Sequence, residues 1–441
     1  MKEGNLEAPK RAPIDWKNPE YYDKQSLEEE MERVFDACHG CRRCVSLCDS
    51  FPTLFDLIDE SDTFEVDGVA KDDYIKVVDE CFLCDLCAET KCPYLPPHEW
   101  AIDFPHLMLR AKAIKYESKK SRWRDKVLTS TDATLGAASS PAIAPLVNKA
   151  LDSKTVRKVL DKGIGIHPEA PVPKFARPAK AYANPSIEGQ NTQGQLKVAI
   201  FATCYDKNTE SSLIEDLTAI LNHNAIQTKI IWDANCCGMP KLELGDLTKV
   251  EKLKESNLPH LVSAIDEGYQ IVSAIPSCVL IFKQELPLMF PEEQALRRIK
   301  DNFFDPFEYL MLHVKQESIN LEFKHSLGKV SYHAACHQRV QNVGAKTREF
   351  LSLIPNSEVD MIERCSGHDG TYAVKSESYE KALKIARPVQ RQISENCVQT
   401  ATNQRNNIQT ATNQQNMCLH CFRRPVMPLW ISKKSQILCT N

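Results

Sequence analysis

The sequence predicts a multidomain α+β protein, in which a cysteine-rich helical domain precedes two tandem α/β repeats. Three observations predict this fold class. Two matching cysteine runs lie near the N-terminus, between residues 38 and 92. Further on, apolar segments rich in β-branched residues alternate with segments of helical period, and cysteines follow the predicted strands. A chain of 441 residues, 42% of them hydrophobic, is long enough for about two to four soluble domains.

The two cysteine runs have metal-type spacing. They read Cys38-x2-Cys41-x2-Cys44-x3-Cys48 and Cys81-x2-Cys84-x2-Cys87-x4-Cys92-Pro93. Three thiolates at i, i+3 and i+6 surround one face of an iron-sulfur cube, and in two-cluster ferredoxins the fourth cysteine of each run binds the other run's cluster. We therefore expect two [4Fe-4S] clusters. The expected ligands are Cys38, Cys41, Cys44 and Cys92 for the first cluster, and Cys81, Cys84, Cys87 and Cys48 for the second.

Zinc and disulfides explain these cysteines less well. Structural zinc sites usually show Cys-x2-Cys pairs without a third cysteine in step. Disulfides need an oxidising compartment, and the charged N-terminal stretch lacks the apolar core of a signal peptide. The second run has four residues before Cys92 where the bacterial ferredoxin pattern has three, which requires a slightly wider loop but no different cluster.

Charge and hydropathy narrow the class of function. The net charge of −4 is spread along the chain and no basic arm is present, so we expect no nucleic-acid partner. The sequence contains no run of about 18 apolar residues, so it predicts no membrane-spanning helix. Eighteen cysteines, many with metal-type spacing, indicate cofactors in a reducing compartment. We expect a cytoplasmic protein, with peripheral docking on the inner face of the cell membrane as an alternative.

The first 195 residues divide into two predicted segments. Residues 1–118 form the helical domain around the cysteine runs, and Ser26 with Glu29 forms a capping box that predicts the start of a helix. Residues 119–195 are rich in Ser, Thr, Ala and Pro, which predicts a linker with a helix near 145–161.

The remaining chain divides into three predicted segments: a first α/β domain at 196–300, a second at 301–397, and a tail at 398–441. The predicted strands lie at 197–204, 228–232 and 271–275 in the first domain, and at 328–336 and 359–362 in the second. Cysteines follow these strands at similar spacings in both domains, which favours two tandem repeats. The tail is rich in Asn and Gln and is predicted to be disordered.

The first repeat contains a candidate thiol site. Cys236 and Cys237 directly precede Gly238, which gives two neighbouring thiolates and a backbone that can approach a cluster closely. With Cys204 upstream and Cys278 downstream, four thiolates converge at the edge where open α/β sheets bind ligands. Two chemistries stay open for this site, a further iron-sulfur cluster and a thiol-disulfide redox pair.

The second repeat has fewer candidate ligands. Cys336 and Cys365 follow its two strands, and Ser366 stands where the first repeat has Cys237. Cys397 is a candidate third ligand. Three histidines lie near these cysteines in the sequence, and each is a candidate ligand, a proton carrier or an ordinary loop residue: His333, His337 and His368.

The chain resembles a known family over about residues 15–395. The matching motifs are CHGCRRCVSLC, CFLCDLCAETKCPYLPPHEW, CCGMP, CHQR and CSGHDG. They are similar to those of the iron-sulfur C subunits of anaerobic glycerol-3-phosphate dehydrogenases, with heterodisulfide reductase subunits as relatives. The resemblance implies an α-helical ferredoxin domain followed by two domains named CCG after their Cys-Cys-Gly element.

The sequence departs from the family pattern in its C-terminal third. The second repeat reads Cys-Ser-Gly in place of Cys-Cys-Gly, and the Asn/Gln-rich tail stands where the family has an Asp-Cys-Pro element. These departures predict a variant, incomplete second CCG-type domain, followed by sequence from a changed reading frame or after a truncation.

The resemblance implies an iron-sulfur electron-transfer subunit of an oxidoreductase. Electrons would pass between a flavoprotein dehydrogenase subunit, or another redox protein, and a membrane quinone or other acceptor, through two [4Fe-4S] clusters and the CCG site. No nucleotide-binding glycine motif is present, so we expect flavin and the organic substrate on a partner. Three alternatives are a disulfide reductase acting at the CCG site, an electron donor to a peroxide-reducing non-haem iron protein, and a non-enzymatic redox sensor.

Overall fold

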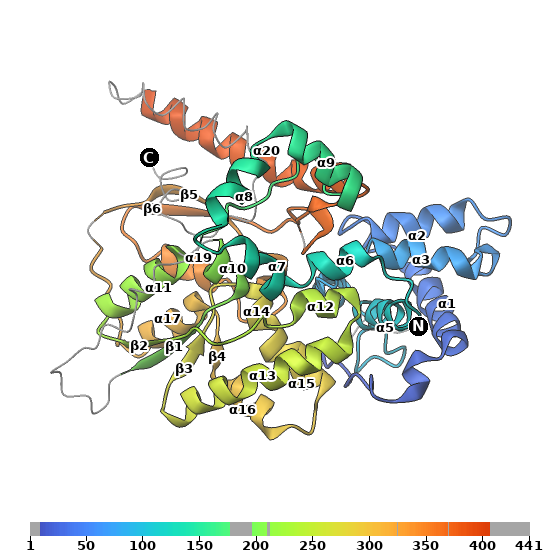
Figure 1. Cartoon of the computed structure of the whole chain (residues 1–441), viewed down its shortest axis with the longest axis horizontal. Helices are drawn as coiled ribbons and strands as arrows, with labels where there is room; N and C mark the ends of the chain where they lie inside the picture. Colours follow the sequence, from blue (N-terminus) through green and yellow to red (C-terminus); the bar gives the residue numbers. More distant parts are fainter. Residues whose placement is uncertain (1–8, 177–195, 210–211, 324, 369, 406–441) are drawn as a thin grey trace.

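The computed structural model describes most of the chain. The described residues are 9–176, 196–209, 212–323, 325–368 and 370–405, and the side chains of residues 212 and 397–405 lie outside this description. In Figure 1 the helical part, in blue, lies at one end of the molecule, and the strands lie toward the other end. The predicted tail lies outside the described residues from residue 406 onward.

The N-terminal part consists of short helices around the cysteine loops. Its α-helices are α1 (Lys24–Cys41), α2 (Ser50–Asp59), α3 (Tyr74–Asp79), α4 (Leu86–Lys91) and α5 (Phe104–Glu117), with 3-10 turns at Pro19–Tyr22, Val66–Gly68 and Lys71–Asp73. Along α1 the apolar residues Leu27, Met31, Val34 and Phe35 recur at helical spacing and are all buried. The Phe35 ring meets Tyr74 edge-on, with centroids 5.0 Å apart. This core fixes the end of α1, where the first cysteines lie.

The start of α1 differs from the prediction. The helix begins at Lys24, and its N-cap is Asp23, whose carboxylate accepts a hydrogen bond from the Ser26 amide at 2.7 Å. Asp and Ser are about equally good N-cap residues, so the sequence offered two caps three positions apart. The upstream cap gives one more helical turn, and the capping box predicted for Ser26 and Glu29 is wrong.

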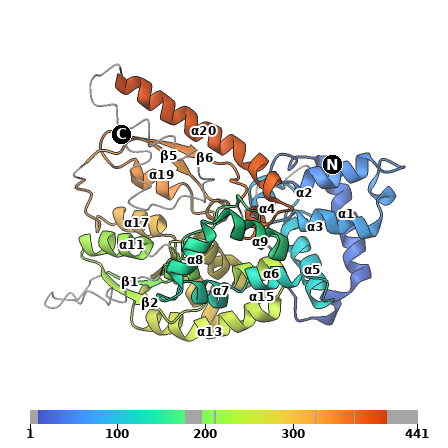
Figure 2. The ribbon, with the colours of Figure 1, turned by 45° about the horizontal axis from the view of Figure 1, so that its top comes forward.

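Residues 119–164, predicted as a linker with one helix, carry four short helices. They are α6 (Trp123–Leu128), α7 (Thr131–Ala138), α8 (Ala144–Leu151) and α9 (Lys154–Ile164). The helix predicted near 145–161 is therefore divided, with Asp152 and Ser153 between its two halves. Figures 1 and 2 show this segment running from α5 across the α/β part, and α7 packs on α10 (Cys204–Asn208).

A four-stranded parallel sheet forms the centre of the first α/β part. Its strands are β1 (Lys197–Phe201), β2 (Gln227–Ile231), β3 (Gln270–Val272) and β4 (Phe303–Phe304), in the spatial order β2-β1-β3-β4. Because all pairs are parallel, the carboxyl ends of β1, β2 and β3 lie at one edge of the sheet. The three strands predicted here are confirmed, with β1 and β3 shorter than expected. The sequence pattern missed β4, since two residues cannot show a period.

Both faces of this sheet are covered. Its helices are α10, α11 (Ser212–His223), α12 (Met239–Leu244), α13 (Leu247–Asp266), α14 (Pro276–Leu280), a π-helix (Ile281–Glu285), α15 (Leu286–Met289), α16 (Gln294–Asn302) and α17 (Pro306–Val314). Along β1, Ala199 and Phe201 belong to one buried cluster, whereas Val198 and Ile200 belong to another. A parallel strand buried on both faces reads as a continuous apolar run, which explains why β1 could be predicted.

The second α/β part is smaller. Its described strands are β5 (Gly328–His333) and β6 (Ser357–Ile362), which pair in parallel, and its helices are α18 (Cys336–Arg339), α19 (Lys346–Leu351) and α20 (Tyr379–Arg405), with a 3-10 turn at Tyr372–Val374. The two predicted strands are confirmed. The two sheets differ in their number of described strands, so the tandem-repeat arrangement stays a prediction. No helix in the described part of the chain has both the length and the apolar character needed to cross a membrane.

A buried cluster of charged side chains joins three parts of the chain. Arg11 donates to both carboxylate oxygens of Asp103 at 2.8 Å, and to Asp85 at 2.7 Å. One oxygen of Glu285 lies 3.4 Å from Arg11, and the other lies 3.1 Å from His106. Asp85 belongs to the second cysteine run, Asp103 caps α5, and Glu285 ends the π-helix. The Arg11 cluster, defined by these five residues, therefore fixes the second cysteine run against the first α/β part.

Burial and ion pairing act in opposite directions within the Arg11 cluster. Burial opposes the charge on His106, but Asp103 and Glu285 outweigh it and raise the His106 pKa to about 9. Burial likewise opposes the carboxylate of Glu285, yet His106 and Arg11 lower its pKa to about 2. Burial raises the pKa of Asp85 to about 7, although Arg11 opposes that shift. Two cations thus face two carboxylates and one carboxyl group that titrates near neutrality.

The first prediction concerns the approach of α12 to α5. Gly245 ends α12 with a φ of +86°, and a Cβ atom there would lie 2.4 Å from the backbone carbonyl of Lys112 in α5. We expect Gly245→Ala to lower the free energy of unfolding by roughly 1 to 3 kcal/mol more than Gly268→Ala does. Gly268 is the matched control because its φ is +85° and no atom lies within 4 Å of its Cβ position. Thermal melts of both variants measure the difference, and equal losses would contradict the close contact of the two helices.

The second prediction concerns pH and His106. An unfolded histidine titrates near a pKa of about 6.5, so the stabilisation from charged His106 is full below that pH and is lost as pH rises through 9. We expect His106→Gln to lower the melting temperature most at pH 6 and least at pH 9.5. The exposed His260 provides the control, since His260→Gln should give the same small change at both pH values. A melting-temperature loss for His106→Gln that grows with pH would contradict the ion pairs described here.

Candidate functional site

Cysteines of both runs gather in the first predicted set. Cys38 and Cys41 lie in the last turn of α1, which Arg42 ends with a φ of +49°, and Cys44 follows in the loop. Cys92 directly follows α4 as its C-cap. Burial raises the pKa of Cys38 well above its usual value, and the three other thiols of the set raise it further through their proximity. The structure therefore places Cys92 of the second run among three cysteines of the first.

The second predicted set gathers in the same way. Cys81 follows α3 and Cys87 lies in the first turn of α4, and two residues between them adopt left-handed φ values of +55° and +60°. Burial raises the pKa of Cys48 well above its usual value, and the nearby thiols of Cys84 and Cys81 raise it further. Cys44 of the first set is among the thiols that raise the pKa of Cys87, so the two sets are neighbours. Proximity groups the thiols as expected for two clusters, and iron binding stays a prediction.

The surroundings of the eight thiols suit iron-sulfur ligation. The Ser50 N–H donates to the Cys48 sulfur, and two backbone N–H groups donate to Cys92. Burial raises the pKa of Cys81 to about 12, although the nearby ammonium of Lys112 opposes this. Such thiols are neutral near pH 7, and a bound metal supplies the positive charge that holds them as thiolates. Within the described residues, no three His, Cys, Asp or Glu side chains are arranged to hold a single metal ion.

Three strand ends bring four further cysteines together. They are Cys204 at the start of α10 after β1, Cys236 and Cys237 after β2, and Cys278 in α14 after β3. All four are buried. The Cys236 thiol interacts with those of Cys204 and Cys237, and the Cys237 thiol interacts with that of Cys278. The structure thus gathers the four residues predicted for this site, which we call the CCG site, at one edge of the sheet.

Residues outside the predicted set hold the CCG site. Both carboxylate oxygens of Asp132, in α7, accept a hydrogen bond from the Cys236 N–H, at 2.8 and 3.0 Å. The Asn257 side chain donates to the Cys236 carbonyl at 3.1 Å. The buried Thr131 hydroxyl lies beside the Cys236 thiol and has no nitrogen or oxygen partner among the described residues. A buried hydroxyl directed at sulfur alone fits a thiolate or a sulfur-bound metal at this position.

Hydrogen bonding distinguishes the CCG thiols from one another. Hydrogen bonds from Cys204 and Cys237 lower the pKa of Cys236 well below its usual value, although burial opposes this. The Gly238 N–H adds to the effect, and Gly238 adopts a φ of +103° that favours glycine. The pKa values of Cys204 and Cys237 are raised because each donates to Cys236 and is buried. The site therefore favours the thiolate form of Cys236, and thiolates are the reactive form in both metal binding and disulfide exchange.

The cysteines of the second α/β part lie beside the second predicted cluster set. Cys336 begins α18 and Cys365 follows β6. The Cys336 thiol interacts with the thiols of both Cys365 and Cys84. Cys365 also lies close enough to Cys48 to raise its pKa. Cys397, the candidate third ligand, lies in α20, but its side chain is outside the described residues.

Two of the three candidate histidines have hydrogen-bonding partners among the described residues. His337 Nδ1 lies 2.7 Å from the Ser277 hydroxyl, which joins α18 to α14 beside Cys278. His333 Nε2 lies 2.7 Å from the Arg364 carbonyl. Burial lowers the pKa of His368 to about 4, so this imidazole is neutral near pH 7. The ligand, proton-carrier and loop alternatives for these histidines stay predictions.

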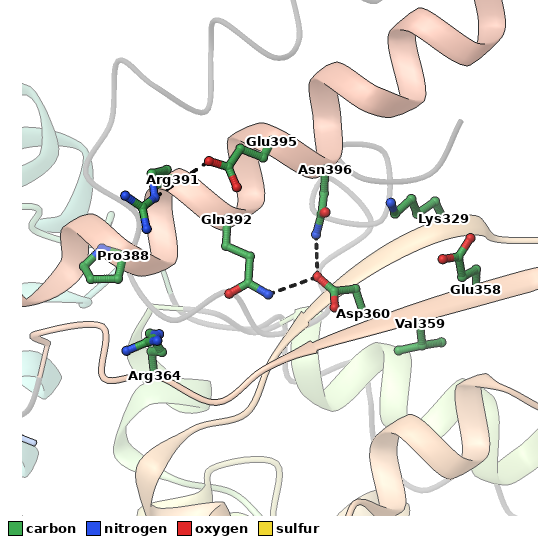
Figure 3. Close-up of a pocket in the computed structure, with 10 residues that line it drawn as sticks. All are labelled: Lys329, Glu358, Val359, Asp360, Arg364, Pro388, Arg391, Gln392, Glu395 and Asn396. Carbon is green, nitrogen blue, oxygen red and sulfur yellow. Dashed lines mark hydrogen bonds and ion pairs between the residues drawn. The ribbon is translucent and has the colours of Figure 1, made fainter.

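A polar cavity of about 460 Å³ lies between α20 and the β5–β6 sheet (Figure 3). Its lining includes side chains of both charges. The lining residues are Lys329, Glu358, Val359, Asp360, Arg364, Pro388, Arg391, Gln392, Glu395 and Asn396. Asp360 accepts hydrogen bonds from Gln392 at 3.2 Å and from Asn396 at 2.6 Å. None of these lining residues is a cysteine, which sets the cavity apart from the thiol sites.

Sequence reasoning missed the residues that hold the thiol loops. Asp132 and Asn257 give no local signal, because each contacts Cys236 from a helix distant in sequence. Asp103 was visible as an N-cap before Phe104-Pro105, but its pairing with Arg11 spans 92 positions. A charged residue inside a cysteine run, such as Asp85, is the one signal that could have indicated a buried partner.

Comparisons with known proteins agree with the cysteine motifs. Residues 198–283 match the family model CCG, described as a cysteine-rich domain. The chain is 28% identical to the C subunit of anaerobic glycerol-3-phosphate dehydrogenase of Escherichia coli K12, over 66% of this chain and 72% of that protein. It is 21% identical to lactate utilization protein A of Bacillus velezensis, over 41% of this chain and 76% of that protein.

A third relative belongs to a reductase. The chain is 26% identical to the B subunit of fumarate reductase (CoM/CoB) of Methanothermobacter marburgensis, over 46% of this chain and 38% of that protein. No solved structure matches the chain. The resemblance predicted from the motifs is confirmed: residues 198–283 match the CCG cysteine-rich domain, and two thirds of the chain are similar to the C subunit of anaerobic glycerol-3-phosphate dehydrogenase.

Proposed function

We propose that this chain is an iron-sulfur electron-transfer subunit of an oxidoreductase. The observation that carries the proposal is the gathering of eight cysteines into two neighbouring sets, each completed by the fourth cysteine of the other run. Such an exchange of ligands is typical of two-cluster ferredoxins. The similarity to subunits of a dehydrogenase and of a reductase supports a role in oxidation and reduction.

The order of the thiol sites suggests a route for electrons. When bound, iron-sulfur clusters take up and release electrons one at a time. Cys44 of the first set lies near Cys87 of the second, and Cys84 of the second set contacts Cys336. The Ser277–His337 hydrogen bond then connects the α18 region to the helix that carries Cys278. We propose that the two cluster sets form the electron-transfer route and that the CCG site is its last redox site.

The partners follow from what the chain lacks and from its relatives. The sequence has no dinucleotide-binding glycine motif, so we propose that flavin and the organic substrate lie on a flavoprotein dehydrogenase subunit. The similar Escherichia coli protein is a subunit of a dehydrogenase, which supports such a partner. A membrane quinone is our proposed acceptor, which would place the chain in the cytoplasm at the inner face of the membrane.

A disulfide reductase acting at the CCG site is the second candidate function. The lowered pKa of Cys236 favours it, because a stabilised thiolate next to Cys204 and Cys237 is the arrangement that attacks a disulfide. Turnover of a small disulfide by the chain with a chemical reductant, lost in Cys236→Ser, would favour this function over electron transfer alone.

The third prediction tests the two cluster sets. Each cluster needs four cysteine ligands, so Cys41→Ser and Cys84→Ser should each remove about four iron and four sulfide per chain after anaerobic purification. Cys439→Ser is the control, since Cys439 belongs to none of the predicted sets. Iron and acid-labile sulfide assays measure the result. Full iron content and unchanged electron transfer in both variants would rule out the proposed route through the two cluster sets.

The fourth prediction concerns the CCG site. None of its four thiols is a proposed ligand of the two [4Fe-4S] clusters, so Cys237→Ser should leave about eight iron per chain in place. If the CCG site holds a further cluster, the wild-type chain should contain clearly more than eight iron, and Cys237→Ser should remove only that excess. A Cys237→Ser chain with fewer than eight iron would show that the assignment of cysteines to sites is wrong.

A further inference from the structure

The pairing of β5 with β6 brings two cysteines to the same point of the sheet edge. His333 is paired with Ile362 at the end of the ladder, and the Ala334 N–H donates to the Ile362 carbonyl at 3.1 Å. Cys336 and Cys365 each lie three residues beyond this pair. Neighbouring strands lie roughly 4.8 Å apart. Because each cysteine follows its strand by the same number of residues, the two cysteine loops begin side by side.

The two thiols are in contact with each other and with the second cluster set. The Cys336 thiol is within hydrogen-bonding reach of the Cys365 thiol and of the Cys84 thiol. The Gly367 N–H donates to the Cys365 sulfur at 3.4 Å, as in the backbone donation to cysteines of the cluster sets. Cys365 also lies near enough to Cys48 to raise the pKa of that thiol. The pair therefore contacts Cys84 and lies near Cys48, which are two of the four proposed ligands of the second cluster.

A buried apolar cluster packs against two of the cysteines in this region. Phe82 and Tyr372 stack edge-on with centroids 4.4 Å apart, and they form a buried cluster against which Cys48 and Cys365 pack. Phe82 belongs to the second cysteine run, whereas Tyr372 belongs to the second α/β part. The two parts thus meet at this buried cluster, beside Cys48 and Cys365.

The composition of the pair suits thiol-disulfide chemistry. The first repeat presents Cys236 and Cys237 together, but the corresponding position in the second repeat is Ser366, whose hydroxyl does not take part in this redox chemistry. Two thiols in contact can form one S–S bond while two S–H bonds break, with release of two protons and two electrons.

We propose that Cys336 and Cys365 form an internal dithiol–disulfide pair that exchanges electrons with the second cluster set through the Cys84 contact. On oxidation the S–S bond forms and two S–H bonds break, and the two protons would go to water. The two electrons would pass one at a time through the cluster that the second set would hold, and then to the partner redox protein. On reduction the same partner supplies the electrons. The pair acts as a two-electron store beside a one-electron carrier. This inference rests on the proposed function, because the cluster is the pair's exchange partner.

The first measurement maps disulfides in the full chain without any substitution. The anaerobically purified protein is oxidised with ferricyanide or reduced with dithionite, alkylated, digested and analysed by mass spectrometry. We expect a peptide linked through Cys336 and Cys365 in the oxidised sample, and both cysteines alkylated in the reduced sample. Alkylation of both residues in the oxidised sample would overturn the inference.

The second measurement counts electrons and iron in variants. Cys336→Ser and Cys365→Ser should keep the wild-type iron content and accept two electrons fewer per chain in a reductive titration, whereas the control Ser366→Ala should match the wild type. Loss of iron in Cys336→Ser would instead make this residue a cluster ligand and overturn the inference. A wild-type chain without iron would defeat the proposed function itself, an outcome that the iron assay separates from the failure of the pair.

Discussion

The Arg11 cluster is the interaction on which the arrangement of the thiol sites depends. A single buried guanidinium contacts carboxylates from the second cysteine run, from the start of α5 and from the π-helix of the first α/β part. An arginine left in a dry core without these partners would be very costly, and so would the carboxylates without it. The observed packing of the helical and α/β parts gives each of these buried charges a partner. In that arrangement the cluster sets and the second α/β part share an interface.

Burial gives the sulfur atoms a common chemistry. Burial raises the pKa values of thiols in both cluster sets, such as Cys38 and Cys87, whereas hydrogen bonds from two neighbouring thiols lower the pKa of Cys236. A thiol buried for packing alone has no need of backbone N–H donors, yet Cys48, Cys92 and Cys365 receive them. Donors directed at sulfur are the protein's means of tuning a cluster or a redox-active thiol. The fold thus supports sulfur chemistry beyond simple packing.

Local sequence signals predicted the elements but not the contacts between them. The hydrophobic pattern of the sequence alone predicts the buried strand β1 and the amphipathic helix α1. The spacing of the cysteines alone predicts how they divide into sets. The cap of α1 was misassigned because Asp23 and Ser26 are equally good caps. Helices α6 to α9 were underestimated because serine and proline mask short helical turns in this segment. The contact of Cys336 with Cys84 could not be predicted, since it depends on how two parts of the chain that are distant in sequence pack.

The central claim is that two neighbouring [4Fe-4S] clusters occupy the two cysteine sets. Electron paramagnetic resonance of the dithionite-reduced, anaerobically purified chain tests it most directly, with iron and sulfide counted on the same sample. We predict a complex spectrum from two reduced clusters that interact magnetically, since Cys44 of one set lies near Cys87 of the other. A simple spectrum from one isolated cluster would contradict the exchange of Cys48 and Cys92 between the sets, and zinc without sulfide would contradict electron transfer altogether.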